Sequence, residues 1–172
     1  MTGSAPSPNP IKRWSVAGVV LVQEDRCLLV QNRRRNGATD WSTPGGVIDQ
    51  GESVLGGLGR EVLEETGIEV DDWHGPLYRV ELDAPGFGFH MIAEAHRALT
   101  FTGELVVDDP DGVVIGAQFV TLDQAPSLLQ SAPLWVAEPL LAHLIEGVMD
   151  GRLFSYRLEG TSDTDRKVVR LQ

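Results

Sequence analysis

Three glutamates lie close together in the segment Arg60-Glu61-Val62-Leu63-Glu64-Glu65. On a helix that turns about 100° per residue, Glu64 and Glu65 lie about 60° and 40° to either side of Glu61, so the carboxylates share one side. Like charges at these spacings destabilise a helix by roughly a few tenths of a kcal/mol per pair, and burial adds to the cost. A cation would relieve the repulsion, and Mg²⁺ prefers oxygen ligands of this kind. The alternative is a solvated acidic helix face.

The helix that must carry these glutamates is predicted over residues 53–66. Its apolar residues form a stripe beside the carboxylates: Val54, Leu55, Leu58 and Val62. Gly56, Gly57 and Gly59 each weaken a helix by up to about 1 kcal/mol relative to alanine. We therefore expect close packing of these glycines against a sheet or a substrate.

The remaining apolar segments alternate with turns, as in a sheet flanked by helices. The expected elements are a hairpin of residues 13–22 and 26–32, a polar loop to residue 46, a short extended segment at 45–49, strands at 77–82, 88–101 and 113–122, a short helix after Asp123, a helix at 135–150 and a last strand at 152–158. Pro139 is expected in the first turn of the later helix. This order predicts a mixed sheet covered by helices.

The segment around the glutamates resembles the Nudix box, G-x5-E-x7-R-E-U-x-E-E-x-G-U, in which U is apolar. The match starts at Gly46, continues through Glu52 and ends at Ile68, with no fixed position missing. The preceding Trp41-Ser42-Thr43-Pro44-Gly45 is similar to the usual lead-in of the family. The resemblance implies an α/β/α sandwich with a mixed β-sheet, over roughly residues 12 to 150.

The resemblance also implies a reaction, in which water attacks the diphosphate linkage of a nucleoside diphosphate derivative. Mg²⁺ would be the cofactor, with Mn²⁺ as a substitute. By position in the box, Glu61, Glu64 and Glu65 would bind the metal, and Glu61 and Glu64 would also serve catalysis. Glu52 and Arg60 would hold the loop and orient these ligands.

The lead-in to the box and the chain before it supply the candidate substrate contacts. Gly45 and Gly46 would bring backbone close to the diphosphate, as the resemblance implies. Among the arginines at 33–35, Arg33 and Arg35 are taken as phosphate contacts, and Trp41 would either stack on a base or pack in the core. ADP-ribose or a nucleotide sugar is the first expected substrate, and a nucleoside triphosphate the second. The alternative function is a Nudix module that binds a nucleotide without cleaving it.

The general base is left open by the sequence. Many members of the family carry a further acid before the last core strand, but residues 112–116 here read Gly-Val-Val-Ile-Gly. The candidates are Asp108, Asp109 and Asp111 in the preceding turn, Glu94 in a strand, or a glutamate of the box itself. We take Glu94 as a catalytic candidate.

Composition limits the other function classes. The 172 residues carry a net charge of −11, which disfavours binding to nucleic acid polymers or anionic membranes. One cysteine excludes an intrachain disulfide and fits a cytoplasmic protein. We expect a disordered tail at 1–11, a Nudix domain at 12–158 and a flexible tail at 159–172. A homodimer is a further expectation, with the apolar segment around Leu153-Phe154 as its interface.

Overall fold

The strands form two sheets, which a computed structural model describes over residues 10–147 and 150–171. The six-stranded sheet has the order β10–β9–β6–β7–β1–β5, and in the four-stranded sheet β3 pairs with β2, β4 and β8. Strand β1 is parallel to β7 and β9 is parallel to β6, whereas the other pairs are antiparallel, so the predicted mixed sheet is confirmed. The elements are β1 Lys12–Val20, β2 Val22–Gln23, β3 Arg26–Arg33, β4 Thr39–Ser42, β5 Gly45–Val47, α1 Val54–Thr66, β6 Glu69–Ala84, η1 Pro85–Phe87, β7 Phe89–Thr102, β8 Val114–Thr121, α2 Ala125–Leu128, η2 Leu129–Ser131, α3 Leu134–Glu146, β9 Arg152–Glu159 and β10 Lys167–Arg170.

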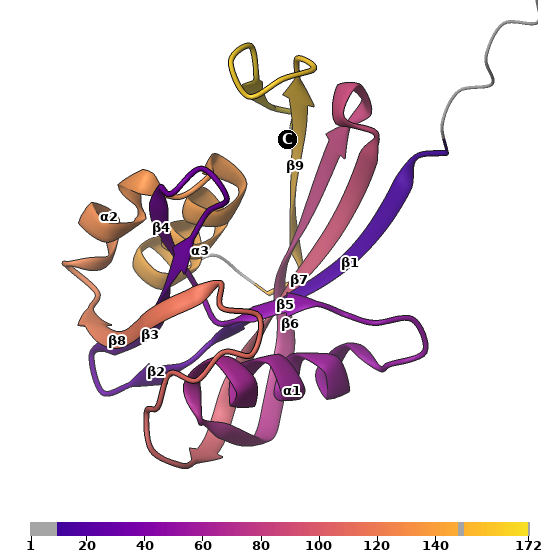
Figure 1. The fold of residues 1–172 in the computed structure, drawn as a ribbon. Coiled ribbons are helices and arrows are strands. Elements are labelled where there is room, and N and C mark those ends of the chain that lie inside the picture. Colours follow the sequence, from indigo (N-terminus) through magenta and orange to yellow (C-terminus); the bar gives the residue numbers. More distant parts are fainter. Residues whose placement is uncertain (1–9, 148–149, 172) are drawn as a thin grey trace, which may run out of the picture.

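Helices cover the strands on separate sides (Figure 1). Leu58 and Val62 of α1 belong to one buried apolar cluster, together with Val19 of β1. The other cluster includes Leu140 of α3 and Phe154 of β9. Burial of apolar side chains on both sides of the strands stabilises this layered arrangement, and the expected α/β fold is confirmed.

The predicted hairpin of residues 13–22 and 26–32 is wrong for most of its length. Strand β1 pairs with β7 and β5, whereas β3 pairs with β4 and β8. The chain turns back on itself only where Val22 and Gln23 face Arg26 and Cys27. Strand β3 is buried along most of its length, whereas β1 is buried only toward its C-terminal end. The apolar composition of the two segments does not reveal which partner each strand takes.

Helix α1 begins and ends close to the predicted residues. The hydroxyl of Ser53 accepts a hydrogen bond from the Gly56 N–H at 3.1 Å, which caps the N-terminus. Gly67 has a φ of 71° and donates its N–H to the Leu63 carbonyl at 2.9 Å, which ends the helix. Leu55 is 39% exposed, so the expected apolar stripe is narrower than the sequence pattern suggested.

Helix α3 is shorter than predicted and starts one residue earlier. It begins at Leu134 after Pro133, so Pro139 lies in its second turn rather than in the first. A proline there cannot donate to the carbonyl four residues earlier. The helix ends at Gly147, whose φ of 65° is left-handed, and the last predicted turn falls partly on residues 148–149, outside the described residues.

The C-terminal segment is part of the six-stranded sheet, which corrects the predicted tail at 159–172. Strand β10 pairs with β9 from Lys167 to Arg170. The Arg170 guanidinium forms an ion pair with Glu138 of α3, and Val168 packs against the apolar core. The polar residues that precede β10 concealed this short strand in the sequence.

Two further expectations can be compared with the structure. Residues 1–9 of the expected N-terminal tail lie outside the described residues, and Ile11 is 54% exposed. In the suggested dimer segment Leu153 is 42% exposed, but Phe154 is buried in the core, so only Leu153 is available to a partner. None of the described helices is long and apolar enough to cross a bilayer.

Candidate functional site

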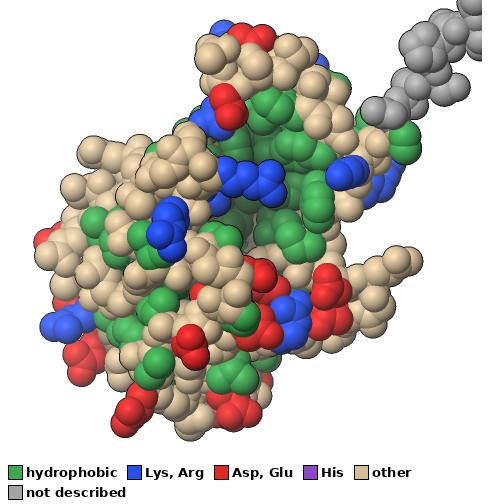
Figure 2. All heavy atoms as spheres, in the orientation of Figure 1, with side chains coloured by type: hydrophobic (Ala, Val, Ile, Leu, Met, Phe, Trp, Pro, Cys, Tyr) green, Lys and Arg blue, Asp and Glu red, His purple; other side chains and the backbone are tan. Residues whose placement is uncertain are grey.

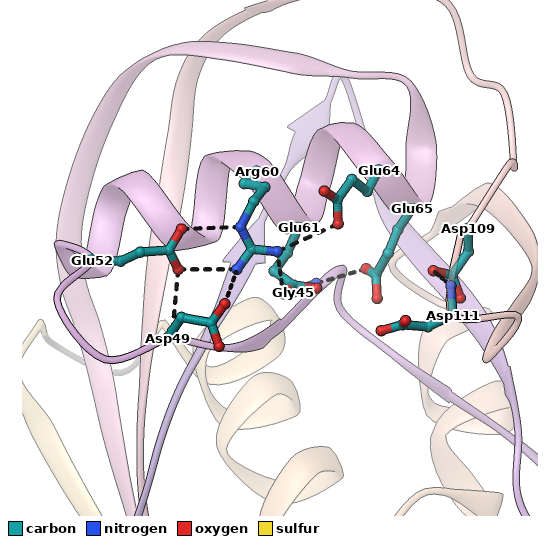
Figure 3. A network of polar contacts seen from close by, with 9 residues as sticks. All are labelled: Gly45, Asp49, Glu52, Arg60, Glu61, Glu64, Glu65, Asp109 and Asp111. Atoms are coloured by element: carbon teal, nitrogen blue, oxygen red, sulfur yellow. Dashed lines mark hydrogen bonds and ion pairs between the residues drawn. The ribbon is translucent and has the colours of Figure 1, made fainter.

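Arg60 lies among the glutamates of α1 and contacts several of them (Figure 3). Its Nη1 donates to Glu61 Oε1 at 2.8 Å and to Glu64 Oε2 at 3.4 Å. Its Nε and Nη2 each donate to Glu52 at 3.0 Å, which makes a two-point ion pair. These hydrogen bonds, first to Glu52 and then to Glu61, raise the pKa of Arg60 above its usual range. The sequence placed Arg60 beside the ligands but did not show that it supplies a positive charge between them.

Glu52 ties this arginine to the loop before α1. Its Oε2 accepts the Asp49 N–H at 3.1 Å, and the Asp49 carboxylate is 3.9 Å from Arg60 Nη2. The hydrogen bond from Arg60 lowers the pKa of Glu52. The structure therefore places Glu52 and Arg60 where they can hold the loop, in keeping with the role that the resemblance implied.

Glu65 is the most buried carboxylate of the cluster, with 8% of its surface exposed. Its Oε2 accepts the Gly45 N–H at 2.9 Å. Burial raises the pKa of Glu65 to about 8, and the nearby carboxylates of Glu61, Asp109 and Glu64 contribute to the rise. Removal from water is costly for the charged form, so Glu65 holds a proton readily until a cation neutralises the site.

Glu61 is partly buried beneath strand β5. Burial raises its pKa, the hydrogen bond from Arg60 opposes that rise, and the charges of Glu64 and Asp111 reinforce it. Glu64 is more exposed than Glu61, with 40% of its side chain accessible against 19%. The three glutamates therefore share one side of α1, as predicted, but occupy different environments.

Steric crowding explains why glycine occupies positions 45 and 46, before the helix. Gly45 has a φ of 136°, and a Cβ on it would lie 2.2 Å from the Ala17 carbonyl oxygen. A Cβ on Gly46 would lie 2.6 Å from Glu61 Oε2. Side chains at these two positions would displace β1 or the Glu61 carboxylate. Glycine thus lets strand β5 approach the carboxylate cluster.

The loop between β7 and β8 brings two more carboxylates to the cluster (Figure 3). Asp109 accepts hydrogen bonds from three backbone N–H groups, those of Asp111 at 3.1 Å, Val113 at 2.7 Å and Val114 at 2.8 Å. These bonds commit Asp109 to the loop conformation. Asp111 is exposed, and its carboxylate points toward the glutamates. Of these two aspartates, Asp111 is therefore the one whose carboxylate is available to face a ligand.

Glu94 lies in β7 and is paired with other residues of the sheet. Its Oε1 accepts from Arg79 Nε at 2.8 Å, and its Oε2 is 3.2 Å from His96 Nε2. Burial would raise the pKa of Glu94, but the hydrogen bonds from Arg79 and His96 lower it. Both oxygens are engaged, and the contacts described for Glu94 include none with the box glutamates, so the structure does not bring it into that cluster.

All three arginines at 33–35 are exposed, and one of them is held in an ion pair. Arg34 donates to Asp40 through Nε and Nη2, both at 2.6 Å. Arg33 and Arg35 are exposed. The Arg33 N–H donates to the Val113 carbonyl at 2.8 Å, which places its backbone beside the loop that carries Asp111.

Trp41 lies in β4 and is half-buried. It packs against the apolar cluster that includes α3, so of the two expected roles the structure places it in core packing.

A hollow in the surface adjoins the acidic cluster (Figure 2). Hydrophobic side chains line it, Lys or Arg side chains extend into it, and acidic side chains border its lower side. It lies between β1 and β7 on one side and β4 and α3 on the other (Figures 1 and 2). Trp14 is paired in register with Met91 and is 41% exposed.

The carboxylate oxygens of the α1 glutamates are chemically suited to bind a divalent cation. Carboxylate oxygens are the ligands that Mg²⁺ and Mn²⁺ prefer, and burial has made Glu61 and Glu65 costly to ionise without a counter-charge. Within residues 10–147 and 150–171, no three His, Cys, Asp or Glu side chains converge closely enough to hold a metal ion as they stand. Glu61 and Glu64 both contact Arg60 instead, so metal binding requires a change in their side chains.

Comparison with known proteins agrees with the box and the fold. The family model described as the NUDIX domain matches residues 12–143. A MutT-like protein of Streptomyces ambofaciens is 51% identical over 67 residues, which are 39% of this chain and 41% of that protein. An oxidized purine nucleoside triphosphate hydrolase of Danio rerio is 31% identical over 108 residues, 63% of this chain and 66% of the relative.

The fold is also found among solved structures. The crystal structure of a MutT NUDIX hydrolase from Burkholderia pseudomallei is 29% identical with a TM-score of 0.63, and covers 75% of this chain and 98% of that one. The two curated relatives are each matched over less than two thirds of their own length, whereas the family model spans more than half of this chain and includes the whole carboxylate helix. The chain therefore belongs to the Nudix family.

Proposed function

We propose that this protein hydrolyses the diphosphate linkage of a nucleotide with the help of a divalent metal ion. The observation that carries the proposal is the set of carboxylates on α1, in a complete Nudix box, at the border of a hollow with hydrophobic walls. Such a hollow suits a nucleoside, and the carboxylates beside it suit a metal that binds phosphates.

Glu61, Glu64 and Glu65 would hold the metal, with Asp111 as a further oxygen donor from the opposite loop. A divalent ion in this position neutralises phosphate charge and lowers the pKa of bound water. Gly45 and Gly46 would bring backbone close to the diphosphate, and a side chain at either position would collide with the protein itself.

Asp111 is our choice for the general base or additional ligand. Two of the other candidates are committed elsewhere, because Asp109 accepts three backbone N–H groups and Glu94 is paired with Arg79 and His96. Asp111 lies close enough to raise the pKa of Glu61. A base must reach the attacking water, and Asp111 faces the cluster from an exposed position.

We assign the phosphate contacts to exposed arginines and the base contacts to apolar residues of β1 and β7. Arg33 and Arg35 are the proposed phosphate contacts, since Arg34 is held by Asp40. Trp14 and Met91 offer an exposed aromatic and a partly buried apolar side chain for a nucleobase.

For the substrate we place nucleoside triphosphates, including oxidised purine forms, ahead of ADP-ribose and nucleotide sugars. The support is the name of the Danio rerio relative. This order reverses the one expected from the sequence.

The test is a turnover assay with Mg²⁺ or Mn²⁺ on a panel of normal and oxidised nucleoside triphosphates, ADP-ribose, nucleotide sugars, dinucleotides and coenzyme A. Released pyrophosphate, phosphate and nucleoside monophosphate would be identified by chromatography. Asp111→Asn should lower kcat strongly, whereas the matched Asp109→Asn should act mainly through loop stability. Tight binding of one nucleotide without turnover of any would instead show a non-catalytic module.

A further inference from the structure

The C-terminal hairpin of β9 and β10 lies beyond residues 12–143, which the family model matches. The Leu171 N–H donates to the Ser155 carbonyl at 2.7 Å, so the contact between the strands continues past the end of β10. The hairpin tip also meets η1, because a Cβ on Gly86 would collide with the Gly160 carbonyl oxygen. In Figures 1 and 2 the hairpin stands at the upper side of the hollow, whereas acidic side chains border the lower side. The hairpin therefore borders the hollow at the end away from the carboxylate cluster.

Both strands of the hairpin are fastened to α3 through Glu138. The Tyr156 hydroxyl of β9 donates to Glu138 Oε2 at 2.7 Å, and the Arg170 guanidinium of β10 donates to Glu138 Oε1. Each carboxylate oxygen thus has a partner on a different strand, and we call these three residues the Glu138 clamp. Burial, followed by the hydrogen bond to Glu138, raises the pKa of Tyr156, so the hydroxyl keeps its proton and donates it. Because Tyr156 is almost fully buried, water competes little for this hydrogen bond.

Helix α3 depends on such contacts in its first half. Pro133 precedes the helix without a side-chain cap, and Pro139 has no N–H for the carbonyl four residues earlier. The buried residues of the helix all lie after Glu138, and they are Pro139, Leu140 and Ala142. The Glu138 clamp therefore secures the half of α3 that contains no fully buried residue.

We infer that the Glu138 clamp holds the hollow at the width that binds the nucleoside of the substrate, and that its three residues are positioning residues for this nucleoside. The clamp joins α3, on one side of the hollow, to the sheet that forms the other side (Figures 1 and 2). The inference rests on the proposed function, which puts the diphosphate at the carboxylates and hence the nucleoside toward the hairpin. Walls that already stand at the right distance bind a nucleoside more tightly, because binding then does not have to order them.

A clamp at this end of the hollow should affect the binding of nucleosides and leave the binding of phosphates unchanged. Without it, α3 samples positions that do not fit a nucleoside, and the apparent affinity falls with the population of the fitting position. Tyr156→Phe removes one hydrogen bond of the clamp, and Arg170→Gln removes the ion pair. We expect each to raise the Kd of a nucleoside monophosphate about three- to tenfold, as the loss of one polar contact does. The Kd of inorganic pyrophosphate should change less than about twofold, because this ligand binds beside the carboxylates.

The experiment is titration calorimetry of the full chain and its variants with AMP, GMP and inorganic pyrophosphate in the presence of Mg²⁺. Arg166→Gln is the matched control for the loss of one arginine, because Arg166 lies in the same hairpin and its described ion pair is the exposed one with Asp163 at 3.2 Å. This control should change each Kd less than about twofold. Glu138→Gln keeps an acceptor for the Tyr156 hydroxyl but loses the charge that attracts Arg170, so it should match Arg170→Gln. Thermal unfolding identifies a temperature at which every variant is folded.

A higher Kd for the monophosphates with an unchanged Kd for pyrophosphate would support the clamp as a positioning device. Equal rises for both kinds of ligand would show a general loss of structure instead, and would overturn the inference. Unchanged values in the clamp variants, or a wild type that binds neither monophosphate, would also overturn it. Turnover of the nucleotide panel tests the proposed function separately. A wild type that hydrolyses a nucleotide while its clamp variants keep full affinity for the monophosphates would refute this inference alone.

Discussion

The buried carboxylate of Glu65 should make the stability of the metal-free protein fall as pH rises. Burial raises the pKa of Glu65 from its ordinary 4.5 to about 8 in the folded state. The folded protein therefore binds this proton more tightly than the unfolded chain does. The corresponding contribution to stability is fully present below pH 4.5 and is lost as pH rises through 8.

The magnitude follows from the size of the shift. Each pKa unit corresponds to about 1.4 kcal/mol, so the change across this pH range is on the order of 4 to 5 kcal/mol in the free energy of unfolding. Glu65 is 8% exposed, so solvent screening reduces this figure little. Glu65→Gln keeps an oxygen that can accept the Gly45 N–H, but it removes the titration.

Urea unfolding in EDTA at several pH values from 5 to 9 would measure the effect. We expect Glu65→Gln to match the wild type at the acidic end and to exceed it in stability at the basic end. Saturating Mg²⁺ should restore much of the wild-type loss at high pH, because a nearby cation favours the charged carboxylate. Parallel pH profiles for wild type and variant would refute the argument from burial.

Three further predictions concern the helix and the substrate contacts. Glu64→Gln should lower kcat about a hundredfold or more while changing the free energy of unfolding by less than about 1 kcal/mol. Unchanged turnover would show that Glu64 does not take part in catalysis. Gly59→Ala should stabilise the protein by up to about 1 kcal/mol, because a Cβ there meets nothing closer than Trp73 at 3.9 Å. The matched Gly57→Ala should destabilise it in denaturant unfolding, since its Cβ would lie 2.8 Å from Glu52 Oε2 and 2.9 Å from Ile48. Arg35→Ala should raise KM several-fold with little change in kcat, because a phosphate contact that is equally strong in the ground state and the transition state affects only binding. An unchanged KM in steady-state assays would show that Arg35 does not contact the substrate.

The sequence alone determined the carboxylate helix and its chemical character. Spacing on a helix places Glu61, Glu64 and Glu65 on one side, whatever the rest of the fold does, and the structure keeps them there. Ser53 and Gly67 bound the helix because capping depends on local residues. Helical spacing and capping residues were therefore enough to predict α1. The box that α1 carries was enough to predict the family.

Strand partners and the C-terminal strand were decided by tertiary structure. Residues 13–22 and 26–32 read as one hairpin, yet β1 and β3 belong to different sheets. Pairing depends on contacts between segments far apart in the chain, which neither apolar composition nor a turn reveals. The same holds for β10, whose pairing with β9 and whose ion pair to α3 through Arg170 replace the expected tail.

The tertiary structure decided which charged side chains contact one another in the site. The sequence offered Asp108, Asp109, Asp111 and Glu94 as candidate acids and favoured Glu94, and only the folded loop shows Asp109 bound by backbone N–H groups while Asp111 faces the cluster. Likewise the sequence predicted that three glutamates on one side of a helix repel one another and that a cation would relieve the repulsion. The structure decided that Arg60 supplies a positive charge in the metal-free state, because Glu52 holds the guanidinium where one of its nitrogens reaches two of those glutamates.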